Sequence, residues 1–582
     1  MPMRLINLLA MTVVLVGCQS ATDSETLAIV NARVYTLAWG EPATDGTPAA
    51  NAPWDGNTWR PDAEAILVRD GKIAFVGSSE EVRARAGPDA RTVDLAGATV
   101  LPGLVDSHTH VTEMGRHEGQ VSLLGSADEN EAVARVAAFA GGVPKGRWII
   151  GYGWDEGAWA NVYPTLDALT AAVPDHPVVL TSLHGFAVWG NRLALAAAGI
   201  DRDAQATSGG EILRDANGDP TGVLLNRATP MLTGAIPPDV FPPLEHQLEA
   251  ALLTMARAGF VAVHEAGLTT ELLAAFERLD EQGRLPIRVY AMVSARDADL
   301  MRRWIARGPR ADPTGRLEIR AVKAYYDGAL GSRGARLLHD YADCPGHRGV
   351  AGGEYGFDEA LVSEAARAGF QVAVHAIGDA GNREVLRFFE QVIATAPATR
   401  TLRHRIEHAQ VVHPDDFPRF ARSAIIASMQ PPHAVEDMPW AEDRLGKDRV
   451  RGAYAWRTLR RTGVRLALNS DLPGSNHDPF YGLHAAVTRR NQAKQPPGGW
   501  YPDQRLTPEE AVRGYTTWAA YAGFSDHVRG RIAPGFLADL TVIDLDPFVA
   551  GTKDPGRLLD GKVLMTMVEG RVVYGAPPAQ GR

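Results

Sequence analysis

The chain has 582 residues, of which 45% are hydrophobic and 22% charged, so it can bury a large core and is too long for one ordinary domain. Lys and Arg number 59 and Asp and Glu 69, a net charge of −10, and the lack of a basic block argues against a nucleic-acid partner. The two cysteines, Cys18 and Cys344, exclude a disulfide framework and four-cysteine metal sites, so any metal must be held by His, Asp, Glu or Lys.

The N-terminal segment has the pattern of a signal peptide over residues 1–17. Its apolar run, 5–16, is too short to span a bilayer. The run ends in Leu15-Val16-Gly17-Cys18, which resembles a bacterial lipobox and implies lipidation of the cysteine; an ordinary signal peptide is the alternative. We therefore expect a tether over 18–26 and a periplasmic lipoprotein, with Gln19 favouring anchoring in the outer membrane.

Both ends of the mature chain are rich in short strands. Apolar runs at 27–30 and 65–68, with a hairpin signal at Arg69-Asp70-Gly71-Lys72, precede similar strands at 538–543 and 568–574. We expect these ends to pair into one small β-sandwich domain built from 27–99 and 530–576.

Strands alternate with helices over residues 100–529. The expected strands lie at 100–108, 260–267, 286–293, 317–328, 370–379, 403–410, 424–433 and 465–474. This alternation predicts an α/β fold with a (β/α)₈ TIM-like barrel, a doubly wound sheet being the alternative. The spacing between the first two strands is too long for one βα step, which places an insertion at about 115–250, where it would roof the catalytic face.

Side chains able to bind metal follow five of these strands. His108 and His110 lie two apart on the first strand and therefore point the same way. The other candidates are Lys323, in an apolar run where a solvated lysine would be unusual, and His375, His408 and Asp471 at later strand ends. Barrel active sites are built at these ends.

This set, together with Pro102-Gly103-Leu104-Val105-Asp106-Ser107-His108-Thr109-His110 and Gly535-Phe536-Leu537-Ala538-Asp539-Leu540, resembles the amidohydrolase superfamily in its two-metal form. Lys323–Arg333, His375–Asp379 and Arg405–His408 are similar to the branch containing YtcJ-like proteins and N-substituted formamide deformylase. The resemblance implies two divalent ions, with zinc suited best to imidazole and carboxylate ligands.

The resemblance also implies a role for each ligand. His108, His110 and Asp471 would hold one metal, His375 and His408 the other, and Lys323, carboxylated by CO₂, would bridge them. A metal-bridging hydroxide would attack an amide-like C–N bond that is not a peptide bond, with Asp471 moving the proton. Asp379 and Glu407 are expected to orient the histidine ligands or to form local ion pairs.

Substrate contacts are predicted on the loops that face this site. His433, after the seventh strand, is expected to hydrogen-bond the oxyanion and is counted with Asp471 as catalytic. Four further side chains are candidates for a small-molecule, amide-like substrate, with ordinary packing as the alternative for the two in the insertion: Trp154, His184, Tyr326 and Arg333.

Two other functions stay open. A dipeptidase, N-acyl amino acid hydrolase or lactonase would use the same metal centre, and Arg333 is the candidate for binding a free carboxylate. A ligand-binding lipoprotein without turnover is opposed by the complete ligand set. The oligomeric state is not determined by the sequence, and a homo-oligomer is one option.

Overall fold

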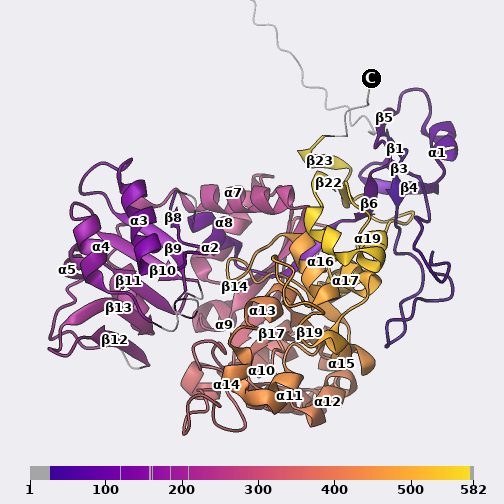
Figure 1. Cartoon of the computed structure of the whole chain (residues 1–582). Helices are drawn as coiled ribbons and strands as arrows, with labels where there is room; N and C mark the ends of the chain where they lie inside the picture. The colour runs from indigo at the N-terminus through magenta and orange to yellow at the C-terminus, as the bar shows by residue number, and fades with distance from the viewer. Residues whose placement is uncertain are drawn as a thin grey trace, which may run out of the picture.

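The computed structural model describes residues 26–576 except positions 118, 156, 158, 160, 161, 184, 207, 208 and 313. The signal peptide, Cys18, most of the tether and His184 therefore lie outside the described residues. Figure 1 shows a central barrel, the insertion on one side of it and a β domain on the other.

The eight predicted barrel strands are all present and form one parallel sheet in the order β20-β19-β18-β17-β16-β15-β14-β7. They are β7 (Leu104–Thr109), β14 (Phe260–Leu268), β15 (Arg288–Ser294), β16 (Leu317–Tyr325), β17 (Gln371–Ala376), β18 (Arg405–His408), β19 (Ile426–Met429) and β20 (Leu466–Leu468). The predicted α/β barrel class is thereby confirmed.

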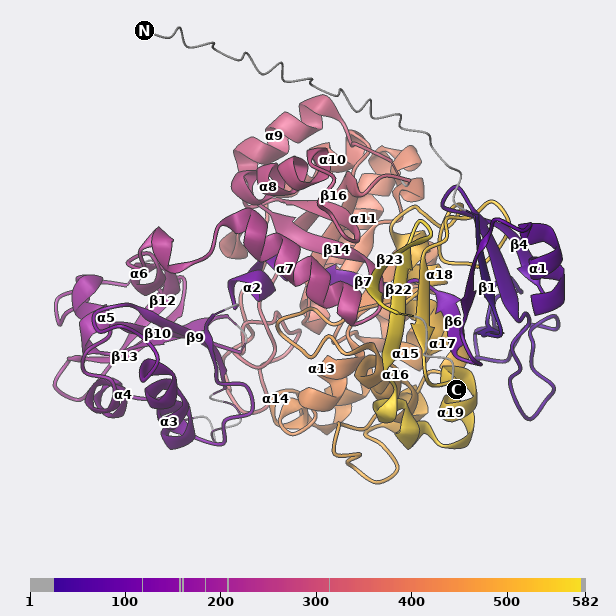
Figure 2. The ribbon, with the colours of Figure 1, turned by 90° about the horizontal axis from the view of Figure 1, so that it is seen from above.

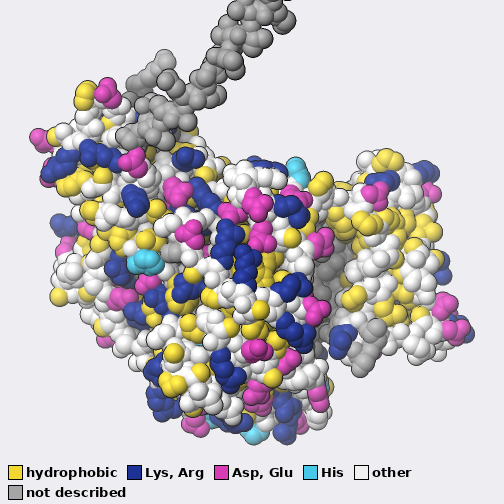
Figure 3. Space-filling model, turned by 180° about the vertical axis from the view of Figure 1, so that it is seen from behind, with side chains coloured by type: hydrophobic (Ala, Val, Ile, Leu, Met, Phe, Trp, Pro, Cys, Tyr) yellow, Lys and Arg dark blue, Asp and Glu magenta, His cyan; other side chains and the backbone are white. Residues whose placement is uncertain are grey.

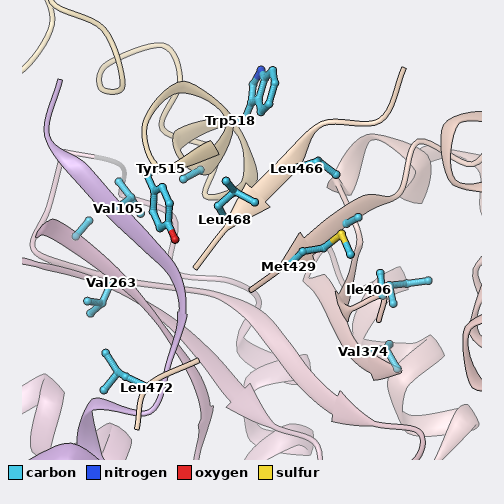
Figure 4. Close-up of a cluster of buried hydrophobic side chains, with 14 of the residues drawn as sticks. Val105, Val263, Val374, Ile406, Met429, Leu466, Leu468, Leu472, Tyr515 and Trp518 are labelled. Carbon is cyan, nitrogen blue, oxygen red and sulfur yellow. The ribbon is translucent and has the colours of Figure 1, made fainter. Parts of the chain in front are cut away.

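The two strands at the ends of this order, β7 and β20, lie next to each other beside the candidate metal ligands. The Asp471 amide donates to the His108 carbonyl at 3.1 Å, and the His110 amide donates to the Leu472 carbonyl at 2.9 Å. On the outside of this seam, Tyr515 lies beside Val105 and Leu468 (Figure 4), and its carbonyl accepts from the Val105 amide at 2.7 Å. The ligands of the first and last strands are therefore tied together through the backbone.

Helices cover the outside of the barrel and follow its strands. They are α2 (Val111–Arg116), α7 (Leu244–Arg257), α8 (Thr270–Glu281), α9 (Ala298–Arg307), α10 (Glu359–Arg367), α11 (Asp379–Thr395), α12 (Phe417–Arg422), α13 (Pro431–Glu436), α14 (Ala441–Arg449), α15 (Trp456–Arg461), α16 (Pro479–Thr488), α17 (Pro508–Gly514) and α18 (Thr517–Ala522).

The sequence explains how such a helix begins and which face it buries. In α8, Leu273, Phe276 and Leu279 recur every three residues and are buried on one face. At the start of α9, the Asp297 carboxylate accepts from the Leu300 amide, which satisfies one of the free amides of the first turn. The barrel helices thus follow from amphipathic periodicity and capping.

The insertion between α2 and α7 has a sheet of its own, in the order β12-β13-β11-β10-β9-β8. Its elements are β8 (Val121–Ser122), α3 (Glu129–Ala140), β9 (Ile149–Trp154), α4 (Leu166–Ala172), β10 (Val178–Ser182), β11 (Ala187–Gly190), α5 (Arg192–Ala197), β12 (Gly210–Arg214), β13 (Pro220–Asn226) and α6 (Thr229–Thr233). The expected limit near residue 250 falls inside α7, which packs against the barrel helices α2 and α8.

The β domain is made from both chain ends, which lie side by side in Figures 1 and 2. Its sheets have the orders β4-β3-β1-β5 and β2-β6-β21-β22-β23. The elements are β1 (Thr26–Val30), β2 (Arg33–Val34), β3 (Ala65–Arg69), β4 (Lys72–Gly77), α1 (Ser79–Ala86), β5 (Arg91–Asp94), β6 (Thr99–Pro102), β21 (Leu540–Ile543), α19 (Pro547–Lys553), β22 (Val563–Val568) and β23 (Arg571–Gly575).

One core joins the two sheets of this domain. Ile29 and Ile66 of the first sheet belong to the same buried cluster as Val542 and Met567 of the second. The strand expected at 568–574 is instead a hairpin, because Glu569 and Gly570 adopt φ values of 53° and 74° and turn the chain.

Seen from behind, basic and acidic side chains are interspersed over the barrel and the β domain, and the insertion forms a separate lobe (Figure 3). Within the described part of the chain, no helix combines the length and apolar character that crossing a membrane requires.

Candidate metal centre

His108 and His110 reach one point from the end of β7. Their Nε2 atoms lie 3.4 and 3.3 Å from the same atom, Asp471 Oδ1. Thr109 between them points the other way, and its hydroxyl donates to Glu265 Oε2 at 2.9 Å. The alternation of the strand therefore brings both imidazoles to the carboxylate that follows β20.

Lys323 lies in the interior of the barrel on β16, and only 1% of its surface is exposed. Its Nζ atom is 2.9 Å from His108 Nε2. Burial lowers the pKa of Lys323 to about 8, since the ammonium form loses its hydration. A substantial neutral fraction near this pH is the form of an amine that can react with CO₂.

His375 and His408, at the ends of β17 and β18, complete the group. Their ring centroids are 4.5 Å apart, and those of His108 and His408 are 5.3 Å apart. Burial lowers the pKa of His375 well below its ordinary value and that of His408 to about 3. Both imidazoles are therefore neutral at physiological pH, which is the form that binds metal.

Asp471 is ionised for the opposite reason. Burial alone would raise the pKa of its carboxyl, but the electrostatic interactions with His108, His110 and His408, including the hydrogen bond from His110, outweigh burial and hold the pKa well below the usual range. The site thus offers an anionic oxygen close to the neutral imidazoles of His375 and His408; the pKa of His110, against the effect of its burial, is raised by its hydrogen bond to Asp471.

Further buried groups hold these ligands in place. Glu407 Oε2 lies 2.5 Å from His108 Nδ1, and Arg405 pairs with the same carboxylate at 2.7 Å. Gln430 Oε1 lies 3.0 Å from His408 Nδ1. Such partners fix the tautomer and the orientation of a ligating imidazole. Asp379, expected in a similar role, instead accepts the Leu338 amide.

The donor set fits divalent metals of the zinc type. Two groups, His108–His110–Asp471 and His408–His433–Asp471, each have ligand atoms within 4.8 Å of one another, and Asp471 belongs to both. Among the described residues, the buried His375 Nε2 has no hydrogen-bond partner. Imidazole and carboxylate ligands suit zinc. His433, predicted to contact substrate, is also close enough to serve as a ligand.

A cavity of about 410 Å³ opens over this centre. The barrel contributes His110, Lys323, His375, His408 and Asp471 to its wall, and His433 lies there as predicted. The insertion contributes the roof. Residues that were not predicted also line the cavity: Glu113, His117, Tyr152, Asp155, Phe186, Arg296, Tyr325, Tyr355, Gln410, Glu436, Asp437 and Trp440.

The predicted substrate residues fall elsewhere, and three of these predictions need correction. Trp154 is buried in the core of the insertion, where its Nε1–H donates to the Leu180 carbonyl at 2.9 Å. Tyr326 donates its hydroxyl to Glu384 at 2.8 Å, and Arg333 pairs with Asp343 at 2.8 Å; neither lines the cavity. His184 lies outside the described residues.

A β-bulge explains the position of Trp154. Tyr152 and Trp154 are two apart on β9 and would share a face of a regular strand. The pairing of β9 with β10 shifts register here, and Gly153 adopts a φ of 92°. Tyr152 therefore faces the cavity while Trp154 turns into the core.

Arg296 could have been found from the sequence by one rule. It lies two residues after the end of β15, and residues that follow barrel strands face the active site. Ser294 and Ala295, which precede it, carry no metal-binding or charged side chain, so the strand end itself gives no chemical signal.

Comparison with known proteins agrees with this geometry. A model described as "Amidohydrolase family" matches residues 91–574. YtcJ of Bacillus subtilis (strain 168) is 34% identical over 518 residues, covering 88% of this chain and 96% of its own. N-substituted formamide deformylase of Arthrobacter pascens is 29% identical over 530 residues, covering 88% and 95%.

A solved structure matches over most of the chain as well. It is an uncharacterized metal-dependent hydrolase from Pyrococcus horikoshii OT3, with a TM-score of 0.71 and 25% identity, and the match covers 91% of this chain and 99% of that one. The resemblance drawn from the motifs is confirmed. The chain belongs to the amidohydrolase family and is a hydrolase.

Proposed function

We propose that the protein hydrolyses an amide-like C–N bond, other than a peptide bond, with two divalent metal ions. The observation that carries the proposal is the convergence of His108, His110 and Lys323 on one point, with Asp471 Oδ1 within 3.4 Å of both imidazoles. The family membership and the N-substituted formamide deformylase among the relatives support this bond type.

The proposed ligands divide into two sets. His108, His110 and Asp471 would hold one ion and His375 and His408 the other, with Lys323 bridging as a carbamate. Zinc fits this donor chemistry best. When bound, such ions activate a water as the nucleophile and polarise the scissile carbonyl.

Asp471 is placed to move the proton. As water adds to the carbonyl carbon, the Asp471 carboxylate takes the water's proton and then delivers it to the nitrogen as the C–N bond breaks, giving a carboxylic acid and an amine. Its position at the cavity wall supports this role. His433, whose Nε2 atom lies 3.8 Å from Asp471 Oδ2, would hydrogen-bond the developing oxyanion.

A combined metal and turnover measurement tests the proposal. The purified protein should contain close to two metal ions per chain and hydrolyse members of a panel of formamides, N-acyl amines and cyclic imides. Asp471→Asn should keep the fold, judged by circular dichroism, while kcat falls at least about 100-fold. Only trace metal, unaltered by zinc and bicarbonate, would instead favour a ligand-binding protein without turnover.

We also propose that the enzyme is tethered in the periplasm through acylated Cys18. The support is the lipobox-like sequence alone. Metabolic labelling with a fatty acid should tag the full-length chain and fail to tag Cys18→Ser, and fractionation should recover the labelled protein with outer membranes. Equal labelling of the two proteins would refute the anchor.

A further inference from the structure

The walls of the metal-centre cavity differ in charge from one side of the barrel to the other. Arg296, after β15, is the one arginine that lines the cavity among the described residues. Glu436 and Asp437 line it at the end of α13, which follows β19. Four steps separate β15 from β19 in the eight-strand order, so these walls face each other across the barrel.

Arg296 is held close to the metal ligands. The preceding residue, Ala295, donates its amide to the Lys323 carbonyl at 2.8 Å. The Arg296 guanidinium carbon lies 4.0 Å from the centroid of the Tyr325 ring, and Lys323 Nζ lies 4.8 Å from the same centroid. The guanidinium therefore stands one aromatic ring away from the proposed bridging lysine.

The guanidinium is also available to a ligand. Arg296 is exposed and lines the cavity, and among the described residues its partners are the Tyr325 ring and the Tyr355 hydroxyl, not a carboxylate. Tyr355 flanks it at 5.4 Å from the ring centroid. Arg333, by contrast, is already paired with Asp343. A planar guanidinium stacked on an aromatic ring presents the donor fork that matches a carboxylate.

The opposite wall carries carboxyl groups instead of a cation. Burial, with a smaller contribution from Glu436 and Asp155, raises the pKa of Asp437 to about 8, and burial raises that of Glu436 to about 7, so the protonated form is well populated near neutral pH. Among the described residues, their hydrogen-bond partners are the hydroxyls of Tyr454, Ser475 and Tyr481 and the Gln410 amide. This wall therefore offers an anionic group of the substrate no ion-pair partner, whereas the Arg296 side does.

We propose that Arg296 binds a free carboxylate of the substrate close to the scissile amide, which assigns the substrates to the class of N-acyl amino acids. This inference rests on the proposed amide hydrolysis at the same site. The carboxylate lies on the β15 side, away from Glu436 and Asp437.

The test compares two compounds that differ only in the carboxylate. N-Formyl-phenylalanine and N-formyl-phenylalaninamide contain the same formyl C–N bond. The metal-loaded enzyme should favour the carboxylate by about 10–100-fold in kcat/KM, the size of a charged hydrogen bond. Arg296→Gln should abolish this preference while it still cleaves the carboxamide, and Arg296→Lys should keep part of it.

A matched control is available on the following helix. Arg302 of α9 pairs with Asp299 at the surface, and Arg302→Gln should leave the preference unchanged. A preference that survives Arg296→Gln would assign carboxylate binding to the metals and overturn the proposal.

Binding separates this inference from the proposed function. N-Methanesulfonyl-phenylalanine and its carboxamide are not cleaved, and calorimetry should show tighter binding of the carboxylate to the wild type but not to Arg296→Gln. If the carboxylate binds more tightly to the wild type but not to Arg296→Gln, and no amide is cleaved, the proposed hydrolysis is refuted while the role of Arg296 stands. Equal binding of the two compounds, or binding of neither, would refute the role of Arg296 even if amides are cleaved.

Discussion

The barrel rim and the inserted roof face the same cavity, but they are built differently. At the rim, strand register sets each metal-binding side chain, and a buried partner fixes it, as Glu407 does for His108. In the roof, the fully buried tryptophans Trp154 and Trp189 pack into the core of the insertion itself. The rim therefore holds the reactive groups, whereas the roof shapes the cavity through side chains at its strand ends.

The largest effect is expected from Lys323→Ala. Loss of the amine removes the proposed bridge and leaves the imidazoles without their shared anion, so one or both metals and nearly all activity should be lost. The metal content per chain and kcat should fall together, and a short carboxylate such as propionate should restore part of both. Turnover at the wild-type level in this variant would contradict the bridging role.

The pKa of Lys323 gives that experiment a pH direction. The neutral amine, which reacts with CO₂, predominates above about pH 8. Reconstitution of metal-free wild type with zinc and bicarbonate should therefore speed up as the pH rises from 6 to 8 and then level off. A rate that falls over this range would argue against carboxylation of the amine.

Much of the rim could be predicted from the sequence because strands obey simple rules. His108 and His110 alternate with Thr109, and His375 and His408 end apolar runs, so their convergence follows from parallel strands that share one edge. The same rules identify the strands of the barrel. Strand alternation does not identify Arg296, which lies in the turn after β15 and can be found only by the rule that residues following a barrel strand face the active site.

The roof could not be predicted in the same way, since its geometry depends on tertiary detail. The bulge at Gly153 separates Tyr152 from Trp154, although regular alternation would put them on one face. The sequence suggests Arg333 as a group that could bind a substrate carboxylate, but in the fold Asp343 lies beside it and forms an ion pair with it. Neither the bulge nor the ion pair can be recognised from a periodic pattern in the sequence.

A smaller effect is expected from Glu407→Gln, which probes the support of the rim. The amide keeps the shape of the side chain but loses the charge that faces His108 Nδ1 and Arg405. Metal affinity should fall by about 10–100-fold, as for other groups that orient a ligating histidine. Competition with a chelator measures the change.

The control for Glu407→Gln is Glu384→Gln, which removes a carboxylate bound to the Tyr326 hydroxyl, away from the cavity lining. Its metal affinity should equal that of the wild type. If Glu407→Gln also bound metal as tightly as the wild type, the Glu407 carboxylate would not affect metal binding by His108.

The smallest effect tests the roof through two neighbours on β9. Trp154→Phe removes the hydrogen bond to the Leu180 carbonyl inside the insertion core, and it should cost about 1–3 kcal/mol of stability with kcat/KM unchanged. Tyr152→Leu alters the cavity wall and should change KM with little effect on stability. Thermal unfolding and steady-state kinetics of both variants measure the contrast. The reverse pattern would mean that Trp154, not Tyr152, contacts the substrate, because only a residue in the cavity can change KM without weakening the fold.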